Sequence, residues 1–386
     1  MTDQRTTGKT TTENTVAENA NAENTNAENA DAENTTADHG SNNADANPAP
    51  LDRLLAYLDN HDPTVEQARE VFQPLTIGEY ENVHIAALLA TIRTRGETFA
   101  DIAGAAQAFI NAARPFPITG AGLLDTAGTG GDGTNTINIS TAASLVAAAG
   151  GAKVVKGGNR SVSSRSGSAD VLEALNIPLD LDVDRAVTQF QNSGFTFLFA
   201  PAYHPAVAHV MPVRKALKVP TLFNTLGPLL SPARPEFQMM GIARPEIGET
   251  IARVFRELGR KRALVVHGSG TDEVAVHGPT TIWELRDGEI AQYELTPEDF
   301  GVARHELAAL EGGDGTANAA AIRAIFEGTA PQAHHDAVAV NAGAMLYVIG
   351  KADSIAEGTA LATQIINDGT AKRWLATHEE ADYGER

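Results

Sequence analysis

The sequence predicts an α/β protein in which a small N-terminal helical domain precedes a larger domain built on a mostly parallel sheet. Three observations support this prediction. Apolar residues recur at helical spacing between residues 51 and 113, short apolar runs alternate with helical patterns after residue 122, and glycine-rich or polar segments follow several of these runs. Alternating strands and helices are typical of a parallel sheet that helices cover.

The charge of the chain disfavours one class of partner. Its 386 residues include 29 Lys and Arg against 49 Asp and Glu, so the formal net charge is −20. A field of this sign repels polyanions. We therefore expect no nucleic-acid partner.

Two absences exclude further classes. The chain has no cysteine, which excludes a disulfide framework, a thiolate metal site and a cysteine nucleophile. No apolar run reaches the ~18 residues of a membrane-spanning helix, and residues 1–12 lack the apolar core of a secretory signal. We therefore expect a cytoplasmic protein with no membrane contact.

Residues 1–50 differ from the rest of the chain. Glu-Asn dipeptides recur every five residues from Glu13 to Glu33, and a step of five residues turns a helix by roughly 140°, so the repeat forms no apolar or polar stripe. After the initial methionine, Val16 is the only large apolar residue, and acidic residues outnumber basic ones by nine to two. We expect a disordered, acidic, low-complexity tail. Without it the net charge is −13, the difference between −20 and −7.

The helical domain is predicted over residues 51–117. Its first helix has one apolar face at i, i+3, i+4 and i+7, formed by Leu51, Leu54, Leu55 and Leu58. Further apolar helical stretches cover residues 65–72, 84–92 and 99–113. The domain is expected to end near Pro115–Pro117, and helices from about residues 203–218 are expected to join it.

The α/β domain is predicted over residues 118–386. Its strands are expected at four short apolar runs, residues 153–156, 195–199, 237–242 and 263–266. The clearest helix covers Pro245–Arg260, with proline at its start and Gly259 near its end. The segment Trp283–Tyr293, interrupted by Asp287-Gly288, is typical of an added hairpin.

Ligands of open parallel sheets bind beyond the carboxyl ends of the strands, so the loops after the strands are candidate sites. The segment 125–136 has four glycines in the six positions 128–133, and Asn138, Ser140 or Thr141 could cap the helix that follows. Unshielded amides at a helix N-terminus bind anions, phosphate most often. A tight turn that needs glycine only for its geometry would show the same pattern.

A second candidate loop, residues 156–168, follows a strand predicted to end at Val155. Lys156, Arg160 and Arg165 occur there with five serines and three glycines, an unusual concentration of cations in an acidic chain. Cations and hydroxyls are suited to phosphates or a diphosphate. A flexible basic linker is the alternative interpretation.

A third loop contains the adjacent carboxylates Asp272 and Glu273, soon after the strand at residues 263–266. Two such groups repel each other unless a cation lies between them. Mg²⁺ suits this position because it binds one or two carboxylates together with substrate phosphate oxygens. A solvated acidic turn is the alternative, but two candidate phosphate loops favour the metal.

Arg214 lies just before Leu217 in an otherwise apolar helical stretch. It is either a surface arginine whose stem packs along apolar neighbours, or a clamp for a substrate carboxylate. The pattern by itself favours the first interpretation.

Six motifs together resemble the anthranilate phosphoribosyltransferase family. They occur in the family's order and spacing: GTGGDG, NIST, GNRSVSSRSGSADVLEALN, APAYHPA, FNTLGPLLSPARP and HGSGTDE. The resemblance extends from about Leu51 to the C-terminus and leaves out the tail. It implies a homodimer formed through the helical domain, an α/β domain of the nucleoside-phosphorylase type, and an active site between the two domains.

The implied reaction joins anthranilate to 5-phosphoribosyl 1-diphosphate, giving N-(5-phosphoribosyl)anthranilate and pyrophosphate in tryptophan biosynthesis. By resemblance, the diphosphate substrate is held by Gly128, Gly131, Asp132, Thr136, Asn138, Ile139, Ser140, Thr141, Lys156, Gly157, Gly158, Asn159, Arg160, Ser161, Val162, Ser163, Ser164 and Ser168. Anthranilate is contacted by Gly128, Asn159 and Arg214. Mg²⁺, expected as two ions per subunit, is bound by Ser140, Asp272 and Glu273.

No residue is assigned as a general acid or base. The aromatic amine of anthranilate is weakly basic and therefore neutral at pH 7, with its lone pair available. We expect catalysis to depend on positioning, with Lys156 and Arg160 stabilising charge on the leaving group.

The chain departs from the family at one position. The family usually has Lys-His-Gly-Asn-Arg where this chain has Lys156-Gly157-Gly158-Asn159-Arg160. The missing imidazole would lie beside the anthranilate pocket, so we expect weaker anthranilate binding or activity. Two alternative functions share the scaffold, a pyrimidine nucleoside phosphorylase and a non-catalytic nucleic-acid-binding paralogue. The Asp-Glu pair disfavours the first, and the net charge of −20 disfavours the second.

Overall fold

The computed structural model describes residues 48–119, 122–160, 165–179 and 181–380. The predicted tail therefore lies outside the described residues except for its last three positions, and Pro50 already begins the first helix. Among the described residues, no helix is both long and apolar enough to cross a bilayer.

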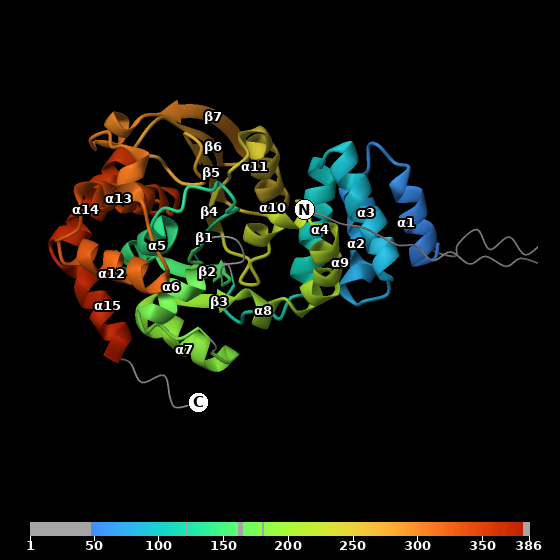
Figure 1. Ribbon diagram of the computed structural model, residues 1–386, viewed down its shortest axis with the longest axis horizontal. Helices are drawn as coiled ribbons and strands as arrows, with labels where there is room; N and C mark the ends of the chain where they lie inside the picture. Colours follow the sequence, from blue (N-terminus) through green and yellow to red (C-terminus); the bar gives the residue numbers. More distant parts are fainter. Residues whose placement is uncertain (1–47, 120–121, 161–164, 180, 381–386) are drawn as a thin grey trace, which may run out of the picture. The chain divides into compact units, whose positions relative to one another are not determined.

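Four helices form the N-terminal part, coloured blue to cyan in Figure 1. They are α1 (Pro50–Leu58), α2 (Val65–Thr76), α3 (Asn82–Arg95) and α4 (Phe99–Ala112). Each matches one of the predicted helical stretches, and α2 and α3 extend beyond the predicted ends. Capping boxes at Thr64 and Thr98 fix the starts of α2 and α4. Each threonine side chain accepts the backbone N–H of the residue three positions later, and the side chain of that later residue accepts the backbone N–H of the threonine.

A later segment packs on these helices. The 3-10 helix η1 (Pro205–His209) contacts α2 and α4, and α9 (Met211–Leu217) contacts α3. Apolar residues from this segment, including Val210 and Val213, belong to the same buried cluster as the cores of α2 and α4. We refer to α1–α4 with η1 and α9 as the helical part.

A seven-stranded sheet forms the centre of the larger part, in the order β3-β2-β1-β4-β5-β6-β7. Its strands are β1 (Leu123–Gly128), β2 (Lys153–Gly158), β3 (Phe195–Phe199), β4 (Phe237–Gly241), β5 (Arg262–Gly268), β6 (Thr280–Arg286) and β7 (Glu289–Leu295). The first five strands in this order are parallel, and β6 and β7 continue the sheet as an antiparallel hairpin. The mostly parallel sheet and the added hairpin are confirmed.

Helices cover both faces of the sheet. They are α5 (Ile139–Ala149), α6 (Ser168–Ala174), α7 (Val183–Ser193), α8 (Ala200–Tyr203), α10 (Phe223–Leu226), α11 (Gly248–Glu257), α12 (Gly315–Phe326), α13 (Gln332–Val348), α14 (Ile355–Asn367) and α15 (Thr370–Glu380). The shorter 3-10 turns are η2 (Gly227–Leu229), η3 (Pro245–Ile247), η4 (Pro297–Phe300) and η5 (Leu307–Leu310).

Side chains of β4 and β5 alternate between two buried clusters. In β5, Leu264 and Val266 pack with α5 and α13, whereas Ala263 and Val265 pack with α11 and α4. Successive side chains of a strand point to opposite faces, so a strand buried on both sides is continuously apolar. Figure 1 shows α13 and α14 on one side of the strands and α11 towards the helical part. One buried cluster thus contains residues of both the helical part and the sheet.

Two predicted loop residues lie inside strands. Asp125, expected at the start of the glycine-rich loop, lies in β1 and is buried. The strand predicted to end at Val155 continues to Gly158, which places Lys156 in the interior. Apolar runs indicate where strands lie, so a strand that also contains polar residues is not recognised over its full length.

The predicted helix Pro245–Arg260 consists of two pieces. Its first turn is the 3-10 helix η3, and α11 follows from Gly248 to Glu257. Gly259 adopts a φ of +76°, which ends the helix as expected.

Two glycines allow the loop after β5 to fold over the ends of its neighbours. Gly128 and Gly241 are paired at the carboxyl ends of β1 and β4. A Cβ atom on Gly128 would overlap the Asp272 carboxylate, and one on Gly241 would overlap the Asp272 carbonyl oxygen. Glycine at both positions is therefore required for Asp272 to lie where it does.

Replacing Gly241 by alanine should destabilise the protein. Because backbone rather than a flexible side chain blocks the new methyl group, we expect the free energy of unfolding to fall by about 2–3 kcal/mol. Urea denaturation measures the loss. Gly157→Ala is the matched control, since a Cβ there would meet only an Asp125 oxygen at 3.7 Å. An equal loss in both variants would contradict the steric explanation.

Candidate active site

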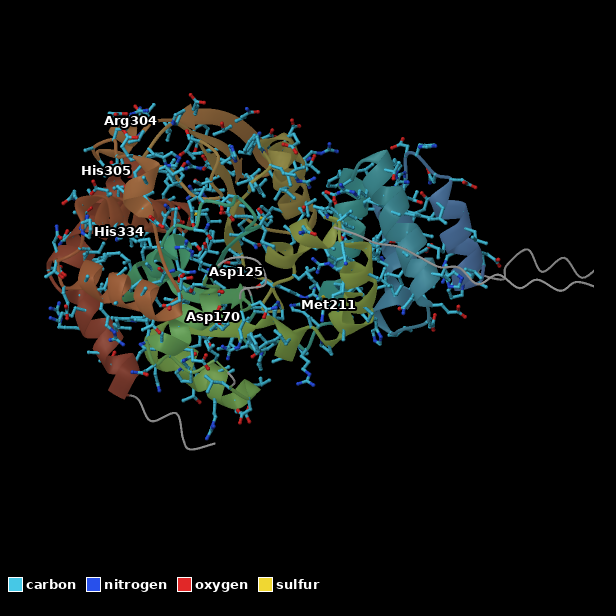
Figure 2. All side chains as sticks on the ribbon, in the orientation of Figure 1. Asp125, Asp170, Met211, Arg304, His305 and His334 are labelled. Atoms are coloured by element: carbon cyan, nitrogen blue, oxygen red, sulfur yellow. The ribbon has the colours of Figure 1, made fainter. Side chains whose placement is uncertain are left out.

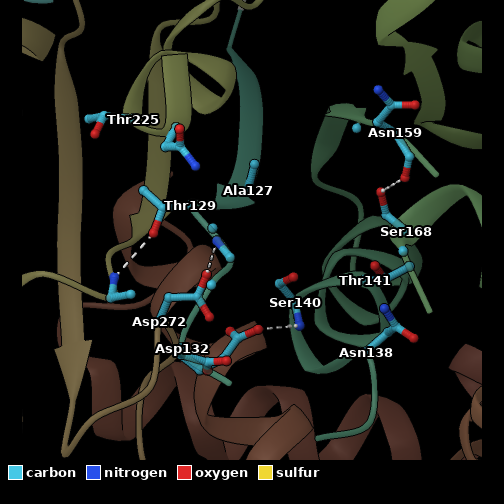
Figure 3. Close-up of a pocket in the computed structure, with 18 of the residues that line it drawn as sticks. Ala127, Thr129, Asp132, Asn138, Ser140, Thr141, Asn159, Ser168, Thr225 and Asp272 are labelled. Atoms are coloured by element: carbon cyan, nitrogen blue, oxygen red, sulfur yellow. Dashed lines mark hydrogen bonds between the residues drawn. The ribbon is translucent and has the colours of Figure 1, made fainter. Parts of the chain in front are cut away.

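The loops at the carboxyl ends of β1, β2, β4 and β5 surround a cavity of about 630 Å³. Arg93 of α3 and Glu97 of the α3–α4 connection form part of its wall. Figure 3 shows part of the lining, with Asp132, Asp272 and Ser140 directed towards the same space. This is the position where open parallel sheets bind their ligands.

The glycine-rich loop connects β1 to α5 through an unusual backbone. Gly130, Gly131 and Gly133 have φ values of +65°, +80° and +76°, a region that residues other than glycine rarely adopt. The Gly130 N–H donates to Asp272 Oδ2 at 2.7 Å. The glycines thus serve the turn geometry and also expose an amide to an acidic group.

The N-terminus of α5 is bound by a carboxylate from another loop. The Ser140 N–H donates to Glu273 Oε1 at 3.0 Å, also visible in Figure 3. Asn138 precedes the helix without capping it, and its amide instead accepts from Asn318 Nδ2 at 2.7 Å. The expectation of a local cap from Asn138, Ser140 or Thr141 is therefore wrong, because a distant acid occupies the helix end.

The acidic corner is formed by Asp272 and Glu273 and carries poorly compensated charge. Burial, together with the neighbouring Asp272 charge, raises the pKa of Glu273 to about 8. Burial and the nearby Asp132 raise the pKa of Asp272 as well. Removing carboxyl groups from water disfavours their ionised form unless a cation is present. This corner therefore has the electrostatics of a cation site.

Lys156 is a buried cation whose charge favours the ionised form of Glu273. Its side chain is 2% exposed, and Nζ donates to the Thr126 carbonyl at 2.8 Å. Burial lowers the pKa of Lys156, while Asp125, Glu273 and Asp272 favour its charged form. In the adjacent strand, the Asp125 carboxylate accepts the Gly157 N–H at 3.2 Å.

The second predicted loop contributes Asn159, Arg160 and Ser168 to the cavity, and residues 161–164 lie outside the described residues. Ser168 Oγ donates to the Asn159 carbonyl at 3.5 Å. The Arg160 guanidinium pairs with both Glu173 oxygens, at 2.7 and 3.1 Å. Two carboxylates of α6, the second from Asp170, therefore already bind this cation.

The acidic corner fits Mg²⁺ by its chemistry. The oxygens of Asp272 and Glu273 are carboxylate oxygens, which this ion prefers as ligands. Among the described residues, no group of three or more His, Asp or Glu side chains is arranged to hold a metal unaided. Mg²⁺ in proteins keeps several waters and takes further ligands from substrate phosphates.

Most of the predicted site residues line this one cavity. They are Gly128, Gly131, Asp132, Thr136, Asn138, Ile139, Ser140, Thr141, Lys156, Gly157, Gly158, Asn159, Arg160, Ser168, Asp272 and Glu273. Arg214 is not among the lining residues. It lies half-buried in α9 with its guanidinium 5.6 Å from the centre of the Phe223 ring.

The sequence analysis missed several lining residues, including Arg93, Glu97, Thr225 and Arg244. Arg244 could have been found, because it follows the predicted strand 237–242 and the rule applied to the other strand ends holds there too. Glu97 had no such signal, since it joins two helices. Its place in the wall depends on how the helical part packs against the sheet.

Comparisons with known proteins agree with this architecture. Residues 52–113 match the family model "Glycosyl transferase family, helical bundle domain", and residues 120–372 match "Glycosyl transferase family, a/b domain". Anthranilate phosphoribosyltransferase of Corynebacterium diphtheriae is 71% identical over 87% of this chain and 98% of its own. The enzyme of a Shewanella species is 52% identical over 80% of this chain and 90% of its own.

Solved structures give the same result. The crystal structure of anthranilate phosphoribosyltransferase from Thermus thermophilus has a TM-score of 0.79 and 42% identity, over 86% of this chain and 98% of that one. The Saccharomyces cerevisiae enzyme, in complex with PRPP and Mg, has a TM-score of 0.75 and 25% identity, over 84% of this chain and 96% of that one. Neither alternative function is the activity of these proteins. The chain belongs to the anthranilate phosphoribosyltransferase family.

Proposed function

We infer that the chain transfers the 5-phosphoribosyl group of 5-phosphoribosyl 1-diphosphate to the amine of anthranilate and releases pyrophosphate. It is a glycosyltransferase of tryptophan biosynthesis. The observation that carries this inference is the cavity that combines a glycine-rich loop, a buried lysine and an Asp-Glu pair, in a chain 71% identical to a named enzyme. Loss of anthranilate fluorescence on adding the diphosphate substrate and Mg²⁺ tests it.

The chemistry breaks one bond and forms another at C1 of the ribose. The amine nitrogen bonds to C1, the C1–O bond to the diphosphate breaks, and pyrophosphate leaves with the electron pair. The nitrogen then releases a proton to solvent. Because negative charge develops on the leaving group, cationic and N–H donors placed there lower the barrier.

The loops after β1 and β2 supply donors for this leaving group. The amides of the glycine-rich loop and the N-terminus of α5 would bind diphosphate oxygens. Lys156 contributes charge from the floor of the cavity, where burial strengthens its electrostatic effect. Arg160 would act after exchanging its present Glu173 partner for the substrate.

Ser140, Asp272 and Glu273 are the residues proposed to bind Mg²⁺, as two ions per subunit. When bound, the metal neutralises charge on the diphosphate and orients it. The raised pKa of Glu273 supports this assignment, since it indicates a carboxyl group whose charge Lys156 compensates only in part.

Gly128, Asn159 and Arg214 are proposed to contact anthranilate. Gly128 and Asn159 line the cavity. Arg214 would clamp the carboxylate, and its burial, which lowers its pKa, makes a carboxylate partner favourable. No general base is assigned, because the neutral amine needs none.

We also propose that two copies of the chain associate through the helical part. Among the described residues, the exposed large apolar side chains include Leu51 and Leu55 of α1, Ile77 after α2 and Val83 of α3. Ile77 is 65% exposed and Val83 is 64% exposed. These residues lie on or next to helices that contact one another. Exposed apolar side chains of this kind are typical of a protein–protein contact, and a second copy is a suitable partner because a symmetric dimer pairs the same surface of both copies.

Replacing Asp272 by Asn together with Glu273 by Gln should abolish Mg²⁺-dependent turnover. The neutral amides keep the shape of the side chains but cannot balance the charge of the ion. Product formation is measured against Mg²⁺ concentration, and circular dichroism checks that the fold is kept. Robust turnover in the double variant would remove the metal assignment.

Gly157→His should lower the KM for anthranilate. The backbone permits a side chain here, because a Cβ would meet only Asp125 Oδ2 at 3.7 Å, and the imidazole would add a wall to the anthranilate pocket. Steady-state kinetics at saturating diphosphate substrate measure the change. Gly157→Ala separates the effect of the imidazole from that of a stiffer loop. An unchanged KM in the histidine variant would refute the prediction.

Leu55→Glu combined with Ile77→Glu should convert the dimer into monomers. The new charges would be buried without partners in the proposed contact. Light scattering after size exclusion should give about half the wild-type mass. Gln292→Glu on the exposed face of β7 is the control and should keep the wild-type mass. A monomeric wild-type protein would contradict the proposal.

A further inference from the structure

Glu97 and Arg244 meet across the wall of the cavity, although the reaction just described uses neither. Arg244 Nη2 lies 2.7 Å from Glu97 Oε2 and 3.2 Å from Thr225 Oγ1. Glu97 belongs to the α3–α4 connection, and Arg244 follows β4. We propose that this ion pair is a strut that holds the helical part at a fixed position against the sheet, and so positions the residues that bind anthranilate.

The Glu97 end of the strut is rigid. Asp101 is fully buried and accepts Tyr57 OH at 2.5 Å and Arg95 Nη2 at 2.6 Å. Its other oxygen accepts the Thr98 N–H at 2.8 Å and the Thr98 hydroxyl at 2.7 Å. Residues on both sides of Glu97 are therefore bound to one carboxylate, which fixes the backbone from which Glu97 extends.

The Glu97 side chain also meets conditions that strengthen an ion pair. It is 11% exposed, whereas the Arg244 side chain is 49% exposed. A largely desolvated carboxylate gains more from a cation than one in open water. Loss of Arg244 would leave the Glu97 carboxylate in the cavity wall without this cation.

The Arg244 end is connected to the glycine-rich loop. The N–H of the preceding Ala243 donates to Thr129 Oγ1 at 3.1 Å, and the Thr129 N–H donates to the Gly241 carbonyl at 2.9 Å. Figure 3 shows Thr129 with this contact beside Asp272. These bonds join the backbone beside Arg244 to the ends of β1 and β4, so this end of the strut is anchored on the sheet itself.

Movement at the strut would reach the anthranilate contacts through α3. The helix α9, which carries Arg214, packs on α3. A second contact joins the same elements, because Arg93 Nη1 of α3 donates to the Pro220 carbonyl at 2.8 Å, shortly after α9. The position of α3 therefore sets the position of Arg214 relative to the sheet.

This inference rests on the proposed function, and it predicts a difference between the two substrates. The described residues among the proposed diphosphate contacts all belong to the larger part that contains the sheet. Anthranilate alone is proposed to contact both the sheet, through Asn159, and the helical part, through Arg214. Loosening the strut should therefore weaken anthranilate binding and leave the diphosphate site unchanged. Glu97 and Arg244 are positioning residues.

The test is Glu97→Gln, which keeps the size of the side chain and removes its charge. A misplaced contact can cost as much as 10²-fold in rate, and for a side chain that acts through another we expect a smaller effect, roughly a tenfold rise in the KM for anthranilate. The KM for the diphosphate substrate and the thermal midpoint should stay at the wild-type values. The exchanged pair, Glu97→Arg with Arg244→Glu, should restore most of the loss.

Glu298→Gln is the matched control, because Glu298 forms a bidentate pair with Arg304 outside the cavity lining. In Figure 2, Arg304 lies among the C-terminal elements, well apart in the view from Met211 of α9. This variant should show wild-type kinetics.

Three results would overturn the strut. They are an unchanged KM for anthranilate in Glu97→Gln, an equal rise in both KM values, and a loss that the exchanged pair does not restore. Failure of the proposed function would look different, since the wild-type enzyme would then form no product from anthranilate and the diphosphate substrate.

Discussion

Negative charge gathered where three strands end is the constraint on which the rest of this structure depends. Asp272 and Glu273 lie over the ends of β1 and β4, in space left open by Gly128 and Gly241. Burial disfavours their charge, and a helix N-terminus, the Gly130 amide and Lys156 compensate only part of it. The glycine-rich turn and the proposed role of a divalent ion both follow from holding these acids together.

Much of the fold could be predicted because its signals are local. The four N-terminal helices, the buried strands and the hairpin at Asp287-Gly288 follow from apolar spacing and turn residues. The strand position of Asp125 and the burial of Lys156 were not predicted, because the burial of these two residues depends on each other's charge and on partners far along the chain. Apolar runs carry no information about such pairs.

The candidate site shows the same division. Loops after strands could be recognised one at a time, since each contains its own glycines, cations or acids. The cap of α5 could not, because Glu273 is 133 residues away from Ser140, and Glu97 enters the cavity wall only through the packing of α3 and α4. Arg244 was within reach of the rule for strand ends. A local sequence pattern does not show which segments, distant in sequence, come into contact in the fold.

The hairpin β6–β7 has a consequence for how the protein behaves at high concentration. It makes β7 the outer strand of the sheet, and an outer strand offers unpaired backbone groups to any extended chain that approaches. Along β7, Glu289 and Glu294 are exposed. A second molecule brought strand to strand would set these like charges side by side. The hairpin thus gives the sheet an edge that resists aggregation.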